Sequence, residues 1–162
     1  MKLKWALLVF VTLLIIVYVW QYHRYPTVRA ILQSTLNTFD FGALLHRQPI
    51  VIQDIVQGLD EISRLWFPNN LKTTFALQAD TWVRTAHKYT VVQPQTDTEV
   101  LLLHAGGRVQ ADGSPDPEET LTAVPLKAQQ LIILPLHSVF SVNQDGVIAL
   151  AVHDWVTRFL PR

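Results

Sequence analysis

Residues 130–156, QLIILPLHSVFSVNQDGVIALAVHDWV, decide the expected fold of this chain. They contain three short apolar runs rich in β-branched residues, at residues 130–134, 139–142 and 147–156. Runs of this kind, separated by polar turn residues such as those at 143–146, predict β-strands. Similar runs come earlier in the chain, at residues 71–77, 88–93 and 99–104. We therefore expect nearly everything after residue 71 to be β.

The part of the chain before residue 71 predicts helices and one further strand. Residues 49–55, PIVIQDI, are nearly continuous in apolar and β-branched side chains, which is typical of a strand at the centre of a sheet. Residues 58–66 predict a short amphipathic helix that Pro68 ends. Thr27 is a good N-cap for a helix running towards Leu36, and we expect residues 25–45 to form a helical packing arm.

Helices at the amino end followed by many short antiparallel strands predict a sandwich or an open barrel, with jelly-roll closure as the expected architecture. The expected fold class is therefore mainly β with N-terminal helices. In this interpretation a single transmembrane helix at residues 1–24 precedes the packing arm, and a jelly-roll β sandwich follows at residues 46–162.

The transmembrane prediction depends on residues 5–20, WALLVFVTLLIIVYVW, which contain no charge, proline or glycine. A helix over them is about 24 Å long, a little short of a hydrocarbon core of about 30 Å. Trp5, Tyr18 and Trp20 are placed like interfacial aromatic residues. We expect an uncleaved anchor in a lipid bilayer, with the C-terminal domain on the non-cytosolic side. The alternatives are a cleaved signal peptide, which lacks the small residues that cleavage needs, and a buried core helix, which normally has a polar face.

Composition narrows the classes of partner and of chemistry. The 162 residues include 13 Lys plus Arg and 13 Asp plus Glu, without a basic cluster, so nucleic acid is not an expected partner. About 140 residues remain after the anchor, enough for one domain with its own core. The chain has no cysteine, which excludes disulfides, thiolate metal sites and a cysteine nucleophile. A protein partner of unknown identity is expected beside the bilayer.

Several stretches resemble cupin-like proteins related to the JmjC oxygenases. Residues 45–52, LHRQPIVI, resemble the short helix and "R-x-P-V-V-I" strand that open that domain. Residues 124–135, VPLKAQQLIILP, followed by residues 147–155, are similar to the family's "L-x-P-G-D-x-L-F-I-P" strand and its final strand. Residues 88–94, KYTVVQP, resemble a "G-K-K-x-x-L-x-P" strand. The resemblance covers most of residues 45–155 and implies a cupin-like double-stranded β-helix.

The resemblance implies a non-haem iron site that begins with His-x-Asp or His-x-Glu and ends with a distal histidine, and the chain lacks both. None of its six histidines has an acid two residues later, and the distal position falls on Phe140. We therefore expect no catalytic residue and no cofactor. The alternative is iron or another divalent metal bound by His104, His137 and His153, which all lie at or beside predicted strands.

Trp82 follows Asp80 and Thr81 in a polar setting, so it is a candidate surface residue for recognition. The predicted function is that of a membrane-anchored, non-catalytic, cupin-like structural or interaction domain. Its likeness to short cupin-like proteins of large DNA viruses suggests an association with a virion or a membrane. The alternative is a metal-dependent cupin-type enzyme, similar to a non-haem iron oxygenase, with displaced ligands. A sugar- or lipid-binding jelly roll is a third hypothesis.

Overall fold

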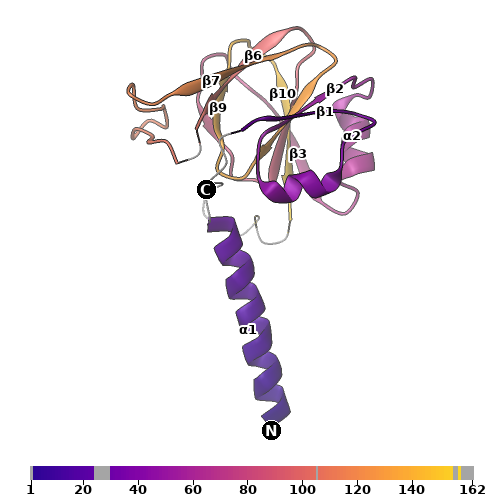
Figure 1. Ribbon diagram of the computed structural model, residues 1–162, viewed down its shortest axis with the longest axis vertical. Helices are drawn as coiled ribbons and strands as arrows, with labels where there is room; N and C mark the ends of the chain where they lie inside the picture. The colour runs from indigo at the N-terminus through magenta and orange to yellow at the C-terminus, as the bar shows by residue number, and fades with distance from the viewer. Residues whose placement is uncertain (1, 24–29, 105, 155–156, 158–162) are drawn as a thin grey trace.

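A computed structural model describes residues 2–23, 30–104, 106–154 and 157, and within the first helix it describes the side chains of residues 4–20. The described residues form the helices α1 (Lys2–His23), η1 (Phe41–His46, a 3-10 helix) and α2 (Leu59–Trp66). The strands are β1 (Leu32–Thr35), β2 (Ile50–Gln53), β3 (Leu71–Ala76), β4 (Val83–Arg84), β5 (Tyr89–Gln93), β6 (Thr98–Leu103), β7 (Leu121–Leu126), β8 (Leu131–Pro135), β9 (Val139–Val142) and β10 (Ile148–His153). Figure 1 shows α1 projecting as a stalk from a head that the described residues from 30 onward form.

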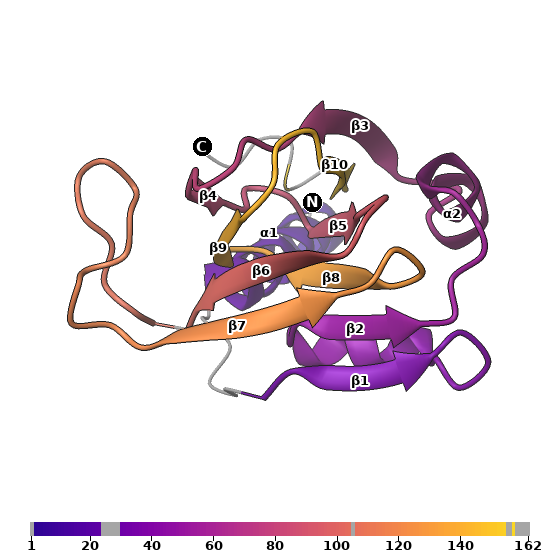
Figure 2. The same ribbon diagram turned by 90° about the horizontal axis from the view of Figure 1, so that it is seen from above.

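Two sheets make up the head. The larger has six strands in the order β1-β2-β8-β5-β10-β3, and the smaller has four in the order β4-β9-β6-β7. Strands β1 and β2 run parallel, and every other neighbouring pair is antiparallel. The loop between β6 and β7 extends away from both sheets in the two views of Figures 1 and 2.

Strand β8 explains why the larger sheet lies in the middle of the head. All five of its residues are buried, and successive side chains point to opposite faces of a strand. Ile132 and Leu134 therefore join the core between the two sheets, whereas Leu131 and Ile133 join a second core on the outer face of the larger sheet. A strand with no polar side must be covered on both faces.

The core between the sheets draws on both of them. The smaller sheet contributes Val100 and Leu102 from β6, Leu126 from β7, and Phe140, which is fully buried in β9. These side chains pack on Val92, Ile132 and their neighbours in the larger sheet. The two sheets therefore pack face to face across this core, as the sheets of a β-sandwich do.

The outer face of the larger sheet is covered by helical residues. Leu44 of η1, Ile62 of α2 and Phe67 just after α2 are buried against Ile50, Val91 and Leu150 of the sheet. The head therefore has three layers: helices, a six-stranded sheet and a four-stranded sheet.

These layers correct the predicted fold class. The described part of the molecule is mixed α/β with two sheets, so the prediction of a mainly β jelly-roll, cupin-like sandwich is wrong. The physical reason is the second core, in which side chains of η1 and α2 pack on the outer face of the larger sheet and so add a helical layer. The helix predicted from Thr27 towards Leu36 is also wrong over its described part, where β1 pairs in parallel with β2.

The predicted single-pass anchor is wrong as well. Among the described residues, no helix is long and apolar enough to cross a membrane. The apolar run at residues 5–20, about 24 Å as a helix, falls short of the hydrocarbon core of about 30 Å. The expected transmembrane and signal-anchor character, the membrane location and the placement of the C-terminal domain on the non-cytosolic side are therefore not supported.

Candidate functional site

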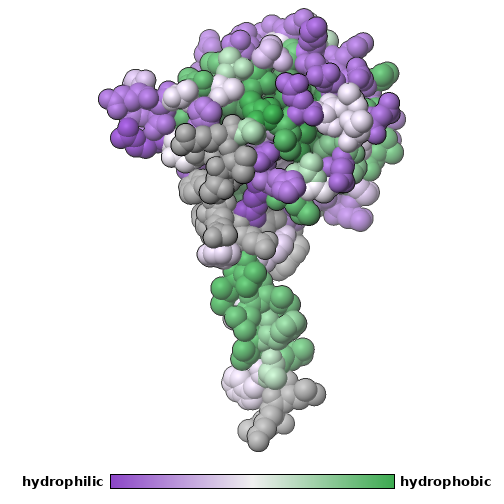
Figure 3. All heavy atoms as spheres, viewed as in Figure 1, coloured by the Kyte–Doolittle hydropathy of each residue, from purple (hydrophilic) through white to green (hydrophobic). Residues whose placement is uncertain are grey.

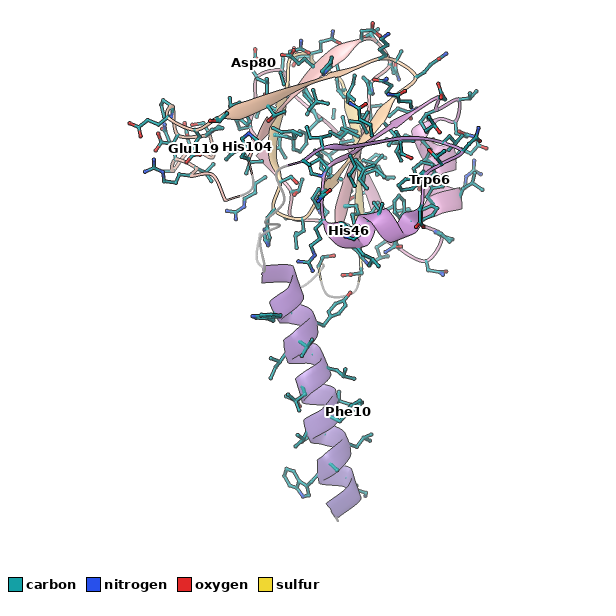
Figure 4. The ribbon with its side chains drawn as sticks, viewed as in Figure 1. Phe10, His46, Trp66, Asp80, His104 and Glu119 are labelled. Carbon is teal, nitrogen blue, oxygen red and sulfur yellow. The ribbon has the colours of Figure 1, made fainter. Side chains whose placement is uncertain are left out.

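The stalk is the most unusual surface of the molecule. Twelve large apolar side chains of α1 are between 46% and 65% exposed: Trp5, Leu7, Leu8, Val9, Phe10, Val11, Leu13, Leu14, Ile15, Ile16, Val17 and Trp20. Figure 3 shows this helix as a hydrophobic column below a head of mixed polarity, and Figure 4 shows Phe10 pointing away from the helix into open space. Soluble single chains rarely expose a continuous apolar surface of this extent.

The stalk has no polar side to face water. Its apolar residues are consecutive, so they surround the helix instead of forming the stripe that an amphipathic helix has. The one hydroxyl in the middle of the run, that of Thr12, donates to the backbone carbonyl of Leu8 at 2.9 Å. That bond satisfies the hydroxyl within the helix, so the side chain does not require water around the stalk.

The base of the stalk is held against the head by an apolar contact and a hydrogen bond. Tyr18 and Val19 pack on Leu136, which is buried. The Tyr18 hydroxyl donates to Oδ2 of Asp154 at 2.7 Å. Since Asp154 follows directly after β10, this bond ties the stalk to the central sheet.

Asp154 is the centre of a small polar network. Its side chain is only 10% exposed, and its Oδ2 lies 3.6 Å from Nζ of Lys88. Its Oδ1 accepts the backbone N–H of Thr157 at 2.8 Å and the Thr157 hydroxyl at 3.0 Å. Charge-assisted hydrogen bonds of this kind are stronger than neutral ones, so the network fixes the position of the carboxylate.

A pocket of about 140 Å³ opens beside this network, at the junction of stalk and head. Its walls are partly apolar and partly cationic: Tyr18, Leu44, Leu45, Arg47, Lys88, Tyr89, Pro135 and Leu136. Four separate parts of the chain supply these residues, namely α1, the end of η1, the start of β5 and the end of β8. The pocket is therefore a product of the tertiary fold.

Arg47 enters the pocket wall from a constrained backbone. It is the C-cap of η1 in the left-handed conformation, with φ of 53°, and its N–H donates to the carbonyl of Leu44 at 3.3 Å. Non-glycine residues seldom adopt this conformation, and such positions cluster at functional sites. Lys88, which directly precedes β5, has its Nζ 5.7 Å from the centre of the Tyr89 ring.

Tyr89 remains a neutral hydroxyl over a wide pH range. Burial raises the pKa of its phenol above 10.0, the positive charge of Arg47 acts in the opposite direction, and the negative charge of Asp154 adds to the rise. Because a phenol donates a hydrogen bond only while it is protonated, the pocket keeps a donor at neutral pH.

The structure does not gather the three candidate metal ligands. His104 follows β6 and has its Nε2 3.2 Å from the Thr122 hydroxyl, and His137 occupies a turn with φ of 70°. His153 ends β10 and packs its ring on His87, with ring centres 4.4 Å apart. In the part of the chain that the structure describes, no group of three His, Asp or Glu side chains is placed to hold a metal ion.

The other predicted site residues fall in different places. Trp5 and Trp20 are exposed at the two ends of the apolar run, whereas Tyr18 is half-buried and bonded to the head. Trp82 is half-buried just before β4, away from the pocket walls.

Sequence reasoning missed Arg47, Lys88 and Asp154 as members of one site. They lie 41 and 66 residues apart along the chain, so no local motif joins them. The one local signal was LHRQPIVI, residues 45–52, which resembles a short helix followed by a strand and contains Arg47. A residue between a helix and a central strand, such as Arg47, can reach side chains at the end of a neighbouring strand.

No protein-family model, curated protein or solved structure matches this chain. The resemblance to cupin-like proteins, including those of large DNA viruses, therefore stays a prediction.

Proposed function

We propose that this protein is a non-catalytic structural protein whose copies assemble through the stalk, so that the assembly displays the heads. The observation that carries the proposal is the exposure of apolar side chains on every side of α1. An all-apolar helix is normally enclosed by other apolar groups, because water contact with that surface is unfavourable. The partner that covers it is a set of further copies of the same chain.

The size of the stalk supports an interface between copies. A cylinder about 24 Å long and about 10 Å wide has a surface of about 750 Å². A stable protein interface buries about 800 Å² of accessible surface on each partner, so the stalk is large enough to supply one. Two helices side by side cover only one side of each other, and the expected assembly therefore contains more than two chains.

The head supports a presenting role. Its two cores are closed within the described residues, with fully buried side chains such as Ile132, Phe140 and Leu150. The head therefore gains its packing from within the chain, and the stalk points away from it (Figure 1). Assembly through the stalk leaves the folded heads at the periphery.

Sedimentation velocity of the full chain in aqueous buffer tests this proposal. We expect a particle of more than two times the 18.5 kDa chain mass. Introducing charge on two different sides of the stalk, with Leu8→Glu and Leu14→Glu together, should give a single chain, because burying unpaired carboxylates opposes assembly. Leu65→Glu is the control: Leu65, in α2, is 63% exposed, close to the 58% of Leu8, and its change should leave the mass unaltered.

Three results would overturn the proposal. The first is that the native chain sediments as one 18.5 kDa unit, and the second is that the doubly charged variant keeps the mass of the native assembly. The third is loss of copy-to-copy contact when neutral phospholipid vesicles are added, with the chain moving to the vesicles. That outcome would assign the stalk surface to lipid instead of to further copies.

A further inference from the structure

We infer that the outer edge of β3 binds an extended segment of a partner protein, which adds a strand to the larger sheet. The segment carries apolar and polar side chains in alternation, with an acidic residue beside Lys72. The inference is carried by a row of backbone groups on β3 that, among the described residues, no strand or side chain occupies. It is independent of the assembly proposed above, because β3 lies in the head.

The hydrogen-bond register shows which backbone groups of β3 face outward. This strand pairs antiparallel with β10, and its other side has no partner strand within the part of the chain that the structure describes. Just after β3, the N–H of Leu77 donates to the carbonyl of Val147, just before β10, at 2.8 Å. Hydrogen-bonded positions alternate along an antiparallel strand, so every second residue before Leu77 bonds to β10. The residues between them turn their N–H and C=O groups away from the sheet: Lys72, Thr74 and Ala76.

The other edge strands of the two sheets are closed to a further strand. Strand β4 has only two residues. Beside β1, the N–H of Thr35 donates to the Thr38 hydroxyl of its own turn at 3.1 Å. In β7, Pro125 lies opposite Glu99, whose carbonyl bonds to the β9 side, so Pro125 faces outward and has no N–H to donate. Proteins commonly protect sheet edges by such means, and β3, with six residues and no proline, lacks them.

The residues of β3 favour an extended partner at this edge. Thr74 and Ala76 are exposed, and Figure 2 shows β3 at the rim of the head. Lysine often protects an edge strand, but the ammonium of Lys72 donates to the Ser63 carbonyl of α2 at 3.1 Å. The Lys72 side chain is therefore held against the helical layer and leaves the outward backbone groups open.

The side chains of β3 determine which segment fits. Phe75 packs on the core between the sheets, and Leu71, which is 53% exposed, lies on the same face because side chains alternate along a strand. An apolar residue of the partner beside them would bury that surface. Lys72 lies on the opposite face, where its bond is to a neutral carbonyl. An acidic residue beside Lys72 adds a favourable cross-strand pair. Backbone bonds supply affinity in such complexes, and alternate side chains supply specificity.

A second copy of β3 matches this edge less well than an acidic segment does. The strand reads LKTTFA and contains no carboxylate. Lys72 would therefore face an uncharged residue or another lysine, and like charges directly opposite each other destabilise a sheet. The occupant is therefore a different protein.

Hydrogen exchange of the full chain with a synthetic peptide tests the inference. The probe is the acetylated peptide Thr-Val-Glu-Val-Thr-Val-Glu. In the lysine peptide both glutamates are replaced by lysine, and in the proline peptide the central valine is replaced by proline, which removes a backbone donor. We expect the probe at millimolar concentration to slow exchange at the N–H groups of Lys72, Thr74 and Ala76. The N–H groups of Thr73 and Phe75 should change little, because they already bond to β10. The probe should bind about two- to fivefold more tightly than the lysine peptide.

Three substitutions separate the edge from the fold. Thr74→Pro removes an outward N–H and keeps the bonds to β10, so it should weaken the binding of the probe at least about fivefold. Ala123→Pro, the same kind of change at an outward position of β7, is the control and should leave binding unaltered. Lys72→Glu should reverse the preference, so that the lysine peptide binds more tightly than the probe. Circular dichroism confirms the fold of each variant, and if Thr74→Pro fails to fold, the charge reversal decides.

The inference fails if the probe leaves exchange at the three outward N–H groups unchanged, or if the proline peptide binds as tightly as the probe. Protection of these groups without peptide, rising with protein concentration, would assign the edge to a second copy and overturn the inference. The stalk variant that combines Leu8→Glu with Leu14→Glu should bind the probe with native affinity. Loss of binding in that variant would place the peptide on the assembled stalks instead of on β3.

Discussion

The Tyr18 hydroxyl donates to Oδ2 of Asp154 at 2.7 Å and so joins two residues 136 positions apart in the chain. One belongs to the stalk, and the other follows the last strand of the central sheet. The bond is partly buried, and the same oxygen lies 3.6 Å from Lys88. This polar cluster therefore contributes to the position of the stalk on the head, together with the packing of Tyr18 and Val19 on Leu136.

Removing this bond should loosen the stalk. We expect Tyr18→Phe to lower the free energy of unfolding by about 1.5–3 kcal/mol, the range for a hydrogen bond to a charged group. Hydrogen exchange of the backbone around residues 14–20 should become faster. Thr12→Val removes a hydroxyl from the same helix whose bond lies within that helix, so it should leave the exchange at the base of the stalk unchanged. Equal effects of the two variants would refute the role of Asp154.

The central layer of the head should be sensitive to the loss of side-chain volume. Ile133 is 1% exposed in β8, and Ile148 is 41% exposed at the start of β10. Ile133→Ala should cost about 2–5 kcal/mol of unfolding free energy, because it removes buried apolar surface and leaves a cavity. Ile148→Ala, the same change at an exposed position, should cost less than about 1 kcal/mol. Urea denaturation of both variants measures the difference, and similar costs would contradict the three-layer packing.

The stability of the head should fall in alkaline solution through Tyr89. Burial raises the pKa of this phenol in the folded chain above the value of 10.0 expected when it is unfolded. A raised pKa means that the folded state holds the proton more tightly than the unfolded state. The stabilisation of the folded state by this difference is complete below pH 10.0 and is lost as the pH rises through the folded pKa. Tyr89→Phe cannot ionise. Urea unfolding between about pH 8 and about pH 11 should therefore show a smaller loss for Tyr89→Phe than for the native chain. Parallel curves would contradict this assignment.

The loop between β6 and β7 should show a local electrostatic effect. The Ser114 hydroxyl and the Ser114 backbone N–H donate to Oδ1 of Asp112 at 2.7 and 3.0 Å, and these bonds hold the pKa of the exposed Asp112 carboxyl below 3.8. Ser114→Ala keeps the backbone bond and removes the hydroxyl. We expect the pKa of Asp112, measured by NMR titration, to rise towards its usual value. An unchanged pKa would show that the hydroxyl bond does not form in solution.

The sequence predicted the strands of the head well and its layers badly. The runs around β5, β6, β8, β9 and β10 were located because each is apolar, β-branched and bounded by turn residues. The layers were not predictable, since β8 reads as one continuous apolar run and only the tertiary structure shows that Ile132 and Ile133 belong to different cores. The segment around Leu32–Thr35 has apolar residues at helical spacing, and its pairing with β2 overrode that local preference.

The candidate site was predictable only in part. The apolar run of the stalk is plain in the sequence, but its interpretation as a membrane span is not supported, since no helix of the described residues is long and apolar enough to cross a membrane. The pocket was not predictable, because Arg47, Lys88 and Tyr18 meet only after β5, β8 and the stalk are in place. A histidine metal site suggested by strand-end positions did not form, since His104 and His153 lie at the ends of strands in different sheets.

The most direct test of the central claim is the distance between stalks of neighbouring copies. The chain has no cysteine, so Phe10→Cys gives a single spin-label site on the stalk, and Val56→Cys gives one at a head residue that is 89% exposed. Packed helices lie about 8–10 Å apart, which brings labels on neighbouring stalks within about 20 Å whichever side they occupy. The account predicts strong dipolar broadening of the electron paramagnetic resonance spectrum at Phe10→Cys, removed by dilution with unlabelled chain, and little at Val56→Cys. A Phe10→Cys spectrum without broadening, unchanged by dilution, would contradict assembly through the stalk.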